Sequence, residues 1–151
     1  MLPGGQRFCP ALKGGTPVSS IIDKVAWVHI GNGRVLCARS RGKDSYYLPG
    51  GKREPGETDK ETLVREIEEE LSVRLKTETI AYFGSFEAQA HGKSEGIVVK
   101  MTCYTADYGG TLTPASEINE IAWLAYADRE RVSPVVQIIF DRLKDMKLLD
   151  A

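Results

Sequence analysis

The sequence lacks several features that would assign it to a specialised class of protein. Its three cysteines, Cys9, Cys37 and Cys103, lie far apart and show no CxxC spacing, which argues against a zinc site and a disulfide framework. No apolar run reaches the length that spans a bilayer, and the N-terminal segment lacks the continuous apolar stretch of a secretory signal. We therefore expect a cytoplasmic protein with reduced cysteines and no membrane partner.

The chain also lacks an excess of charge of either sign. Its 20 lysines and arginines oppose 21 aspartates and glutamates, which gives a formal net charge of -1. Such a balance supplies no general attraction to nucleic acid, so we expect no nucleic-acid partner. Any phosphate-bearing ligand must be held by local groups, and a metal ion is the simplest of these.

The length of 151 residues fits one folded domain. Residues 1–20 are rich in glycine and proline and show no periodicity, so we predict a flexible N-terminal arm there and a folded domain over 21–151. Strand-like composition marks five segments of that domain, namely 23–30, 34–40, 79–90, 96–106 and 120–125. The GNG turn after the first segment and the polar turn HGKSE after the third predict two hairpins.

A helix is predicted over 133–146, near the end of the chain. Ser133 suits its N-cap and Pro134 its first position. The apolar face is set by Val135, Ile138, Ile139 and Leu143. This face could also be a dimer surface, so a homodimer stays an open alternative.

The most informative segment is 51–73, GKREPGETDKETLVREIEEELSV, in which a glycine turn leads into a carboxylate-rich helix. Glu66, Glu69 and Glu70 fall close together on such a helix, and their like charges repel one another. A Glu-rich helix alone is compatible with a solvated outer face, but a hard dication such as Mg²⁺ or Mn²⁺ would also balance the charges. The opposite face is apolar and belongs in the core, through Leu63, Val64, Ile67 and Leu71.

These residues resemble the signature of the Nudix hydrolases. The matching positions are Gly51, Glu57, Arg65, Glu66, Ile67, Glu69, Glu70 and Val73. The resemblance implies an α/β fold, a Nudix-like αβα sandwich around a mixed β-sheet. It also implies Mg²⁺-dependent hydrolysis, by attack of water on phosphorus, of a nucleoside diphosphate that is linked to another group.

The resemblance further implies the roles of the site residues. Glu66, Glu69 and Glu70 would be the principal metal ligands, and the carbonyl of Gly50 an additional one. The cofactor would be Mg²⁺, with Mn²⁺ as a possible substitute. Metal ions that span carboxylates and a diphosphate carry most of the catalysis in phosphoryl transfer.

Two further roles follow from the same resemblance. Glu57 and Arg65 would pair and hold the loop against the helix. The general base is open: Glu66 belongs to the signature, whereas Glu117 and Glu120 come from a later part of the chain that could reach the metal.

One position departs from the family pattern. Ser72 stands where the family has a glycine, at a helix end that adopts a left-handed conformation. A serine there costs on the order of 1 kcal/mol. We therefore predict that Ser72→Gly raises the melting temperature and leaves activity intact.

The resemblance implies a nucleotide substrate, and we infer its class by elimination. The marks of the ADP-ribose, dinucleoside polyphosphate, NADH and coenzyme A branches are absent, while YLPGGK resembles the mutator-type (MutT-like) branch. A (d)NTP or its oxidised form is therefore the leading substrate, with NMP and pyrophosphate as products. The alternative is a non-catalytic Nudix-like module that senses a nucleotide or sugar nucleotide.

Two groups of side chains are candidates for substrate contact. Lys52 and Arg53 lie next to the glycine turn and could touch phosphates. A base could stack on aromatic rings drawn from Trp27, Tyr82, Phe83 and Phe86.

Overall fold

The computed structural model describes residues 20–90, 93 and 96–151. The predicted arm over 1–20 and the predicted turn over 91–95 therefore lie almost wholly outside the described residues. None of the helices within the described ranges is long and apolar enough to cross a membrane. In chain order the elements are β1 (Ser20–Trp27), β2 (Ile30–Gly31), β3 (Arg34–Ser40), β4 (Gly50–Gly51), α1 (Asp59–Leu71), β5 (Arg74–Leu75), η2 (Thr77–Thr79), β6 (Ala81–Gln89), β7 (Ile97–Thr105), β8 (Tyr108–Gly109), β9 (Ile118–Leu124), η3 (Tyr126–Arg131) and α2 (Pro134–Asp145).

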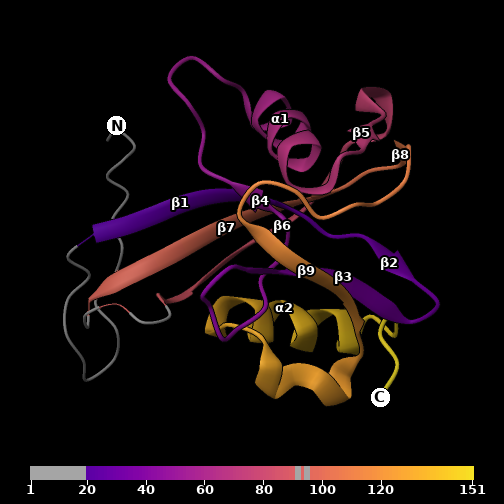
Figure 1. Cartoon of the computed structure of the whole chain (residues 1–151). Coiled ribbons are helices and arrows are strands. Elements are labelled where there is room, and N and C mark those ends of the chain that lie inside the picture. Colours follow the sequence, from indigo (N-terminus) through magenta and orange to yellow (C-terminus); the bar gives the residue numbers. More distant parts are fainter. Residues whose placement is uncertain (1–19, 91–92, 94–95) are drawn as a thin grey trace.

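The strands form a mixed four-stranded sheet and two smaller antiparallel sheets. The large sheet has the order β4-β1-β7-β6, in which β1 and β7 run parallel; the others are β2-β3-β9 and β5-β8. Helix α1 covers one side of the strands and α2 the other (Figure 1). The predicted α/β sandwich around a mixed sheet is thereby confirmed.

The prediction of a single strand over 23–30 is wrong. Strand β1 ends at Trp27 and pairs with β7 in the large sheet, whereas only β2 continues into a hairpin with β3. The chain changes sheets at 28–29, where the amide of Val28 still donates to Tyr104 O of β7. The hairpin that remains is tight, because Asn32 and Gly33 both take positive φ (54° and 77°).

The second predicted hairpin is present, with β6 and β7 as its strands. They pair antiparallel from Ala81↔Thr105 to Gln89↔Val98, with a register shift between Tyr82 and Gly84. Strand β7 therefore lies between β6 and β1 and connects the hairpin to the rest of the sheet.

Helix α1 is defined at both ends by local contacts. Thr58 caps it, since its side chain accepts from the amide of Glu61 while the Glu61 carboxylate accepts from the amide of Thr58. The helix ends at Ser72, whose φ of 64° is left-handed as predicted. Its buried apolar residues join the α1-side core, the cluster of Val25, Trp27, Leu36, Leu63, Ile67, Leu71, Val73, Leu75, Ile80 and Ala106.

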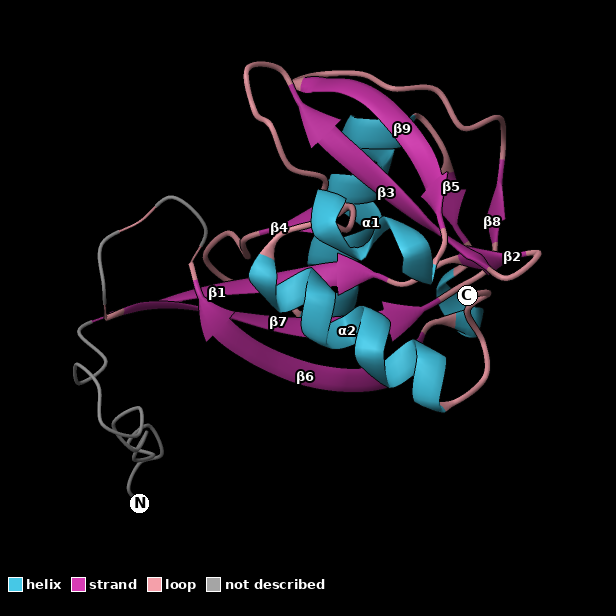
Figure 2. Ribbon diagram, turned by 90° about the horizontal axis from the view of Figure 1, so that it is seen from below, coloured by secondary structure: helices cyan, strands magenta, loops and turns pink. Residues whose placement is uncertain are grey.

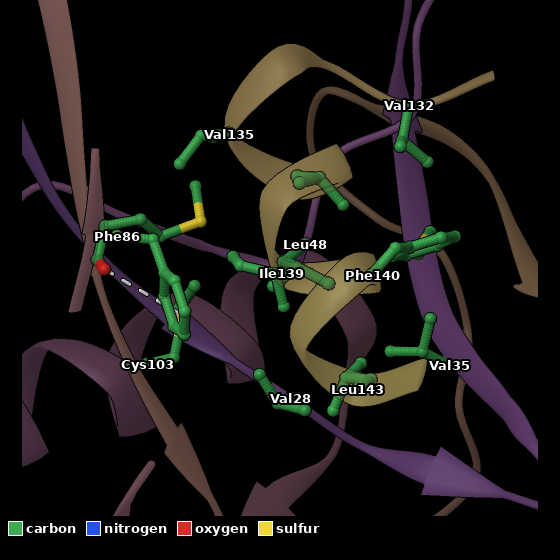
Figure 3. Packing of buried hydrophobic residues seen from close by; sticks show 14 of the residues in the cluster. Val28, Val35, Leu48, Phe86, Cys103, Val132, Val135, Ile139, Phe140 and Leu143 are labelled. Atoms are coloured by element: carbon green, nitrogen blue, oxygen red, sulfur yellow. Dashed lines mark hydrogen bonds between the residues drawn. The ribbon is translucent and has the colours of Figure 1, made fainter. Parts of the chain in front are cut away.

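Helix α2 begins at Pro134, as predicted, and lies across the large sheet (Figure 2). Its buried face consists of Val135, Val136, Ile139, Phe140 and Leu143. Ile138 is 40% exposed, so its assignment to the apolar face is wrong; it lies to the side of the stripe that starts at Val135 and Val136. The apolar face points toward the strands (Figure 3) and is therefore not available as a dimer surface.

The core between α2 and the strands is the larger of the two. We call it the α2-side core; besides the α2 residues it contains Val28 from the connection between β1 and β2, Val35 from β3, and Phe86 and Cys103 from the β6–β7 hairpin (Figure 3). Met101 of β7 also belongs to it. Both described cysteines, Cys37 and Cys103, are buried free thiols, in agreement with the expectation of reduced packing residues.

Candidate active site

The site is built around the two-residue strand β4. Gly50 and Gly51 pair with Ala26 and Val25 of β1. Gly50 has a φ of 148°, and a Cβ there would overlap the carbonyl oxygen of Val25. A Cβ on Gly51 would lie 2.5 Å from the carboxylate of Glu66. Gly50 therefore requires glycine, whereas a side chain at Gly51 would displace the carboxylate of Glu66, which lies directly against the backbone there.

Arg65 links the loop that follows β4 to helix α1. Its guanidinium donates to Glu57 through Nε (2.7 Å) and Nη2 (2.9 Å), and Nη2 also donates to Lys52 O (3.2 Å). Hydrogen bonds from Arg65 are the main reason why the pKa of Glu57 falls to about 2. Glu57 is therefore held as a carboxylate, and the pairing that the family resemblance implied is present in the structure.

Glu57 also ties its own loop together. Its Oε1 accepts from Thr62 Oγ1 (2.8 Å) and from the amide of Glu54 (2.9 Å). Thr62 is fully buried at the start of α1. The loop between β4 and α1 is thus fixed to the first turn of the helix by hydrogen bonds from both backbone and side chains.

Glu70 is the buried carboxylate of the site. It is 5% exposed, and its Oε1 accepts from the amide of Gly50 at 3.1 Å. Burial raises its pKa to about 8. The charges of Glu66 and Glu117 also raise this pKa, whereas the hydrogen bond from Gly50 lowers it. Burial also raises the pKa of Glu66. These acids therefore lie where a nearby positive charge would stabilise their ionised form.

Glu69 and Glu66 both face Arg65. The Nη1 of Arg65 lies 3.0 Å from Glu66 Oε2 and 3.5 Å from Glu69 Oε1. In the part of the chain that the structure describes, no three acidic, histidine or cysteine side chains converge as closely as a metal site requires. The donor set nevertheless consists of carboxylate oxygens, which are the ligands that Mg²⁺ and Mn²⁺ prefer, and the buried Glu70 lacks a full counter-charge. The residues therefore fit a hard divalent cation.

A cavity of about 340 Å³ adjoins this carboxylate group. Gly50 and Glu70 line it together with Tyr47 and a set of apolar residues from β1, β7 and the start of α2. Four of its lining residues are lysines, namely Lys24, Lys43, Lys52 and Lys93. The cavity thus brings a buried acid and several cations together.

Lys24, on β1, is the partly buried lysine of the cavity wall that lies in the large sheet. Burial lowers its pKa, and the charge of Lys52 lowers it further, whereas Glu70 and Glu66 raise it. Its ammonium lies 5.9 Å from the centre of the Tyr47 ring, within the range of a cation–π contact. An anion in the cavity would stabilise the charged form of this side chain.

The two acids from the later part of the chain occupy different places. Glu117 lines the cavity, and its Oε1 accepts from Ser116 Oγ at 2.7 Å. Glu120 instead bonds Arg39 Nη2 (2.6 Å) and the hydroxyl of Tyr46. Of the two candidate bases, the structure therefore brings Glu117 to the site and places Glu120 in a separate cluster.

The candidates for substrate contact are also divided. Lys52 lines the cavity, whereas Arg53 pairs with Asp23 (2.7 Å) and Asp59 (2.8 Å). Tyr82 is 64% exposed on β6, and Phe83 packs partly buried against the α2-side core; neither lines this cavity.

The expectation that Trp27 and Phe86 could stack on a base is wrong. Trp27 has no exposed surface, and its indole nitrogen donates to the carbonyl of Ala106. Phe86 is 6% exposed in the α2-side core. Both rings are packing residues, because β1 and β6 turn them toward opposite cores.

Lys24, Lys43 and Tyr47 were not predicted from the sequence as residues of the site. Lys24 carries a usable signal, because it is a lone cation within the otherwise apolar stretch KVAWV of a central strand. Lys43 and Tyr47 lie in a polar connection and reach the cavity only through the tertiary fold, so local pattern gives no indication of their position.

Fold and site together define a class of enzyme. A mixed sheet between two helices positions a glycine turn against a carboxylate-rich helix, as in a Nudix pyrophosphohydrolase. The model of the NUDIX domain matches residues 24–139, and the chain therefore belongs to the Nudix family. The family acts on nucleoside diphosphates linked to a further group and typically uses a divalent metal.

Solved structures share the fold. The MutT Nudix hydrolase of Burkholderia pseudomallei gives a TM-score of 0.68 at 20% identity, over 82% of this chain and 98% of that one. The E. coli ORF135 protein gives 0.67 at 24% identity, over 85% and 91%. A UDP-X diphosphatase gives 0.62 at 21% identity, over 87% and 64%. No curated protein matched the sequence.

Proposed function

We propose that this protein is a Mg²⁺-dependent pyrophosphohydrolase whose substrate is a (d)NTP or an oxidised NTP, with NMP and pyrophosphate as products. The observation that carries the proposal is the cavity in which the buried carboxylate of Glu70 and four lysines lie together. A divalent cation beside Glu70 and a polyphosphate beside the lysines would each receive the opposite charge that they need.

The proposed metal ligands are Glu66, Glu69, Glu70 and the carbonyl of Gly50. When bound, Mg²⁺ or Mn²⁺ would neutralise charge on the pyrophosphate and lower the pKa of a coordinated water. The protein's own contribution is position: Gly51 admits the carboxylate of Glu66 against the backbone, and Arg65 fixes the preceding loop through Glu57.

In the proposed reaction a water oxygen forms a bond to phosphorus, and the bridging P–O bond of the anhydride breaks. The electron pair of that bond leaves with the pyrophosphate, and the proton of the water passes to a carboxylate. Glu66 of the family signature is our proposed acceptor, with Glu117 as the alternative because it lines the cavity. Lys52 is proposed to bind a phosphate.

The substrate class is supported by what surrounds the charged part of the cavity. Apolar side chains such as Val99 and Met101 line it and give a nucleoside an apolar surface. Ser133 lines it too, and the buried hydroxyl of this residue has no hydrogen-bond partner among the described residues. Several structural neighbours are MutT proteins, which favours a nucleoside triphosphate. Another neighbour is a UDP-X diphosphatase, which is compatible with the wider class of nucleoside diphosphates linked to another group.

The decisive experiment is a substrate panel. The purified protein is incubated with the four dNTPs, the four NTPs, 8-oxo-dGTP, ADP-ribose and UDP-glucose, in Mg²⁺ and then in EDTA, and phosphate, pyrophosphate and NMP are measured. We expect NMP and pyrophosphate from a triphosphate in Mg²⁺ only. Tight binding of a nucleotide without turnover in Mg²⁺ or Mn²⁺ would overturn the proposal and favour the sensor.

A further inference from the structure

We propose that Tyr46, Glu120, Arg39 and Arg131 form a positioning cluster that holds residues 41–47 and thereby shapes the wall of the substrate cavity. The inference rests on the proposed function only in that turnover is one of its readouts. It assigns Glu120 a role at a distance from the reacting atoms, in place of the catalytic role that the sequence suggested.

The cluster is centred on the ring of Tyr46, which is 7% exposed. The guanidinium of Arg131 lies over the ring at 5.1 Å from its centre, and that of Arg39 at 5.9 Å. The hydroxyl donates to the carboxylate of Glu120, whose other oxygen accepts from Arg39 at 2.6 Å. The charges and the hydrogen bonds therefore complement one another around one aromatic ring.

The partners of Tyr46 come from three separate elements. Arg39 lies on β3, Glu120 on β9 and Arg131 at the end of η3. The backbone of Tyr46 adds two bonds to the same region, because its amide donates to Arg131 O (2.9 Å) and its carbonyl accepts from the amide of Ser133 (3.2 Å). The cluster thus joins the β2-β3-β9 sheet to the start of α2.

The cluster reaches the cavity through residues 41–47. Arg39 Nη1 donates to the carbonyl of Lys43 (3.0 Å), and Tyr47 exchanges two backbone bonds of 2.8 Å with Ala38. Lys43 and Tyr47 both line the cavity, as does Ser133. Each of these lining residues is directly bonded to, or adjacent to, a member of the cluster, so loss of the cluster should displace groups that contact substrate.

The amide of Arg41 gives the segment a further bond, to the carbonyl of Glu117 at 2.8 Å. Glu117 lines the cavity and is the alternative base of the proposed reaction. The same 41–47 segment therefore connects the cluster with both the cationic and the acidic parts of the cavity wall.

Two mild variants test the proposal. Tyr46→Phe removes the hydroxyl but keeps the ring between the guanidiniums, and Glu120→Gln keeps the shape but removes the charge. With the triphosphate that the wild type hydrolyses fastest among dATP, dCTP, dGTP and dTTP, we expect KM to rise about five- to tenfold and kcat to stay within about twofold. The pH profile of kcat should keep its shape, because no group that transfers a proton has been removed.

Glu68→Gln is the matched control, since it removes an exposed ion pair with Arg74 (3.3 Å) outside the cavity and should leave both constants unchanged. Amide hydrogen exchange provides a readout that needs no turnover. We expect exchange over 41–47 to be faster than in the wild type in both variants and unchanged in the control. If the wild type hydrolyses none of the dNTPs, NTPs or 8-oxo-dGTP of the substrate panel, the proposed function is wrong, and the exchange data still test the cluster.

Two outcomes would overturn the proposal. Unchanged exchange over 41–47 together with an unchanged KM in Tyr46→Phe would show that the cluster does not shape the cavity. A large fall of kcat in Glu120→Gln with a shifted pH profile would show that Glu120 acts on the reacting atoms. Tyr46→Phe keeps the test valid even where Glu120→Gln folds poorly.

Discussion

Helices α1 and α2 cover opposite sides of the strands, yet they differ in what they bury. The buried face of α2 contains only apolar side chains. The buried face of α1 contains Leu63, Ile67 and Leu71 but also Thr62 and the carboxylate of Glu70. Burying an ionised group without a full counter-charge costs free energy, whereas burying an apolar side chain contributes stability.

The difference separates two tasks within one small domain. The α2-side core supplies stability, because nothing in the buried face of α2 requires desolvation of charge. The α1 side gives up some stability and in return places acids at a fixed position beside Gly50 and Gly51. Changes on α1 should therefore affect turnover more than stability, and changes on α2 should do the reverse.

The largest expected effect is the loss of turnover in Glu70→Gln. The amide oxygen of glutamine can still accept from Gly50, so the fold should be retained, but the charge that would hold the metal is lost. We expect kcat in Mg²⁺ to fall by about a hundredfold or more, since metal contributes several kcal/mol to such reactions. Steady-state kinetics and thermal unfolding measure the two effects separately.

Glu68→Gln serves as the control for this variant, because Glu68 is exposed on the same helix and pairs only with Arg74 among the ion pairs of the described residues. We expect its activity to equal that of the wild type. Near-normal turnover in Glu70→Gln would remove the proposed metal ligand and with it the functional contrast between the two helices.

A matched pair of core substitutions sharpens the comparison. Ile67 on α1 and Ile139 on α2 both have no exposed surface, and replacing either with valine should cost about 0.5–1.5 kcal/mol of unfolding free energy. Ile67 is next to Glu66 in the chain, so we expect Ile67→Val also to lower kcat a few-fold, whereas Ile139→Val should not. Urea unfolding and kcat are measured for both, and equal effects on kcat would contradict the division of tasks.

The contrast also explains what could be predicted from the sequence. The apolar face of α1 repeats at helical spacing within one short segment, so local pattern indicates it, and the left-handed Ser72 was expected from the family signature. The exchange of sheets at 28–29 follows from the parallel pairing of β1 with β7, which joins residues about 77 positions apart and leaves no local signal. Helix α1 was therefore easier to predict from the sequence than the strand pairing of the large sheet.

The composition of the cavity wall was also predictable only where its residues lie close together in the sequence. Glu66, Glu69 and Glu70 lie within one short segment of α1, so they could be proposed together from the sequence. Lys24 and Lys43 come from different segments and meet only because β1 and the 41–47 segment border one cavity. Glu120 was one of three candidates for the general base, chosen on its position in the sequence, but Arg39 on the neighbouring strand binds its carboxylate.

A smaller effect is expected at the helix ends, where both helices are followed by a residue other than glycine in the left-handed region. Ser72 has a φ of 64° and Lys147 a φ of 62°. Glycine at either position should stabilise the fold by up to about 1 kcal/mol, or about 2–4 °C in Tm. Ser72→Gly should gain less, because the bond from Ser72 Oγ to Thr113 O (3.2 Å) is lost.

Differential scanning calorimetry of Ser72→Gly and Lys147→Gly measures these gains. Activity should be unchanged in both, since neither side chain lines the cavity. A lower Tm in Ser72→Gly would show that the hydrogen bond to Thr113 outweighs the backbone cost, and the difference between the two variants gives the contribution of that bond.

The smallest effect concerns the pH dependence of stability on the α1 side, where His29 contacts the aromatic rings of Trp27 and Tyr108. The His29 ring stacks on Trp27 at 4.7 Å and meets Tyr108 edge-on at 5.1 Å. Burial lowers its pKa, and the charge of Asp107 opposes the shift only in part. The unfolded chain therefore binds a proton more readily, and the stability that the neutral ring contributes is present above the unfolded pKa of about 6.5 and is lost as pH falls below it.

The variant His29→Gln isolates this contribution. It should be less stable than the wild type at pH 7.5, because the stacking on Trp27 is lost. At pH 5.5 the gap in unfolding free energy between the two proteins should be smaller, since only the wild type must keep an imidazole neutral or bury its charge. Urea unfolding at both pH values measures the gap. A constant gap would show that His29 titrates alike in the folded and unfolded chains, and the pH sensitivity of the α1 side would then have to come from its carboxylates.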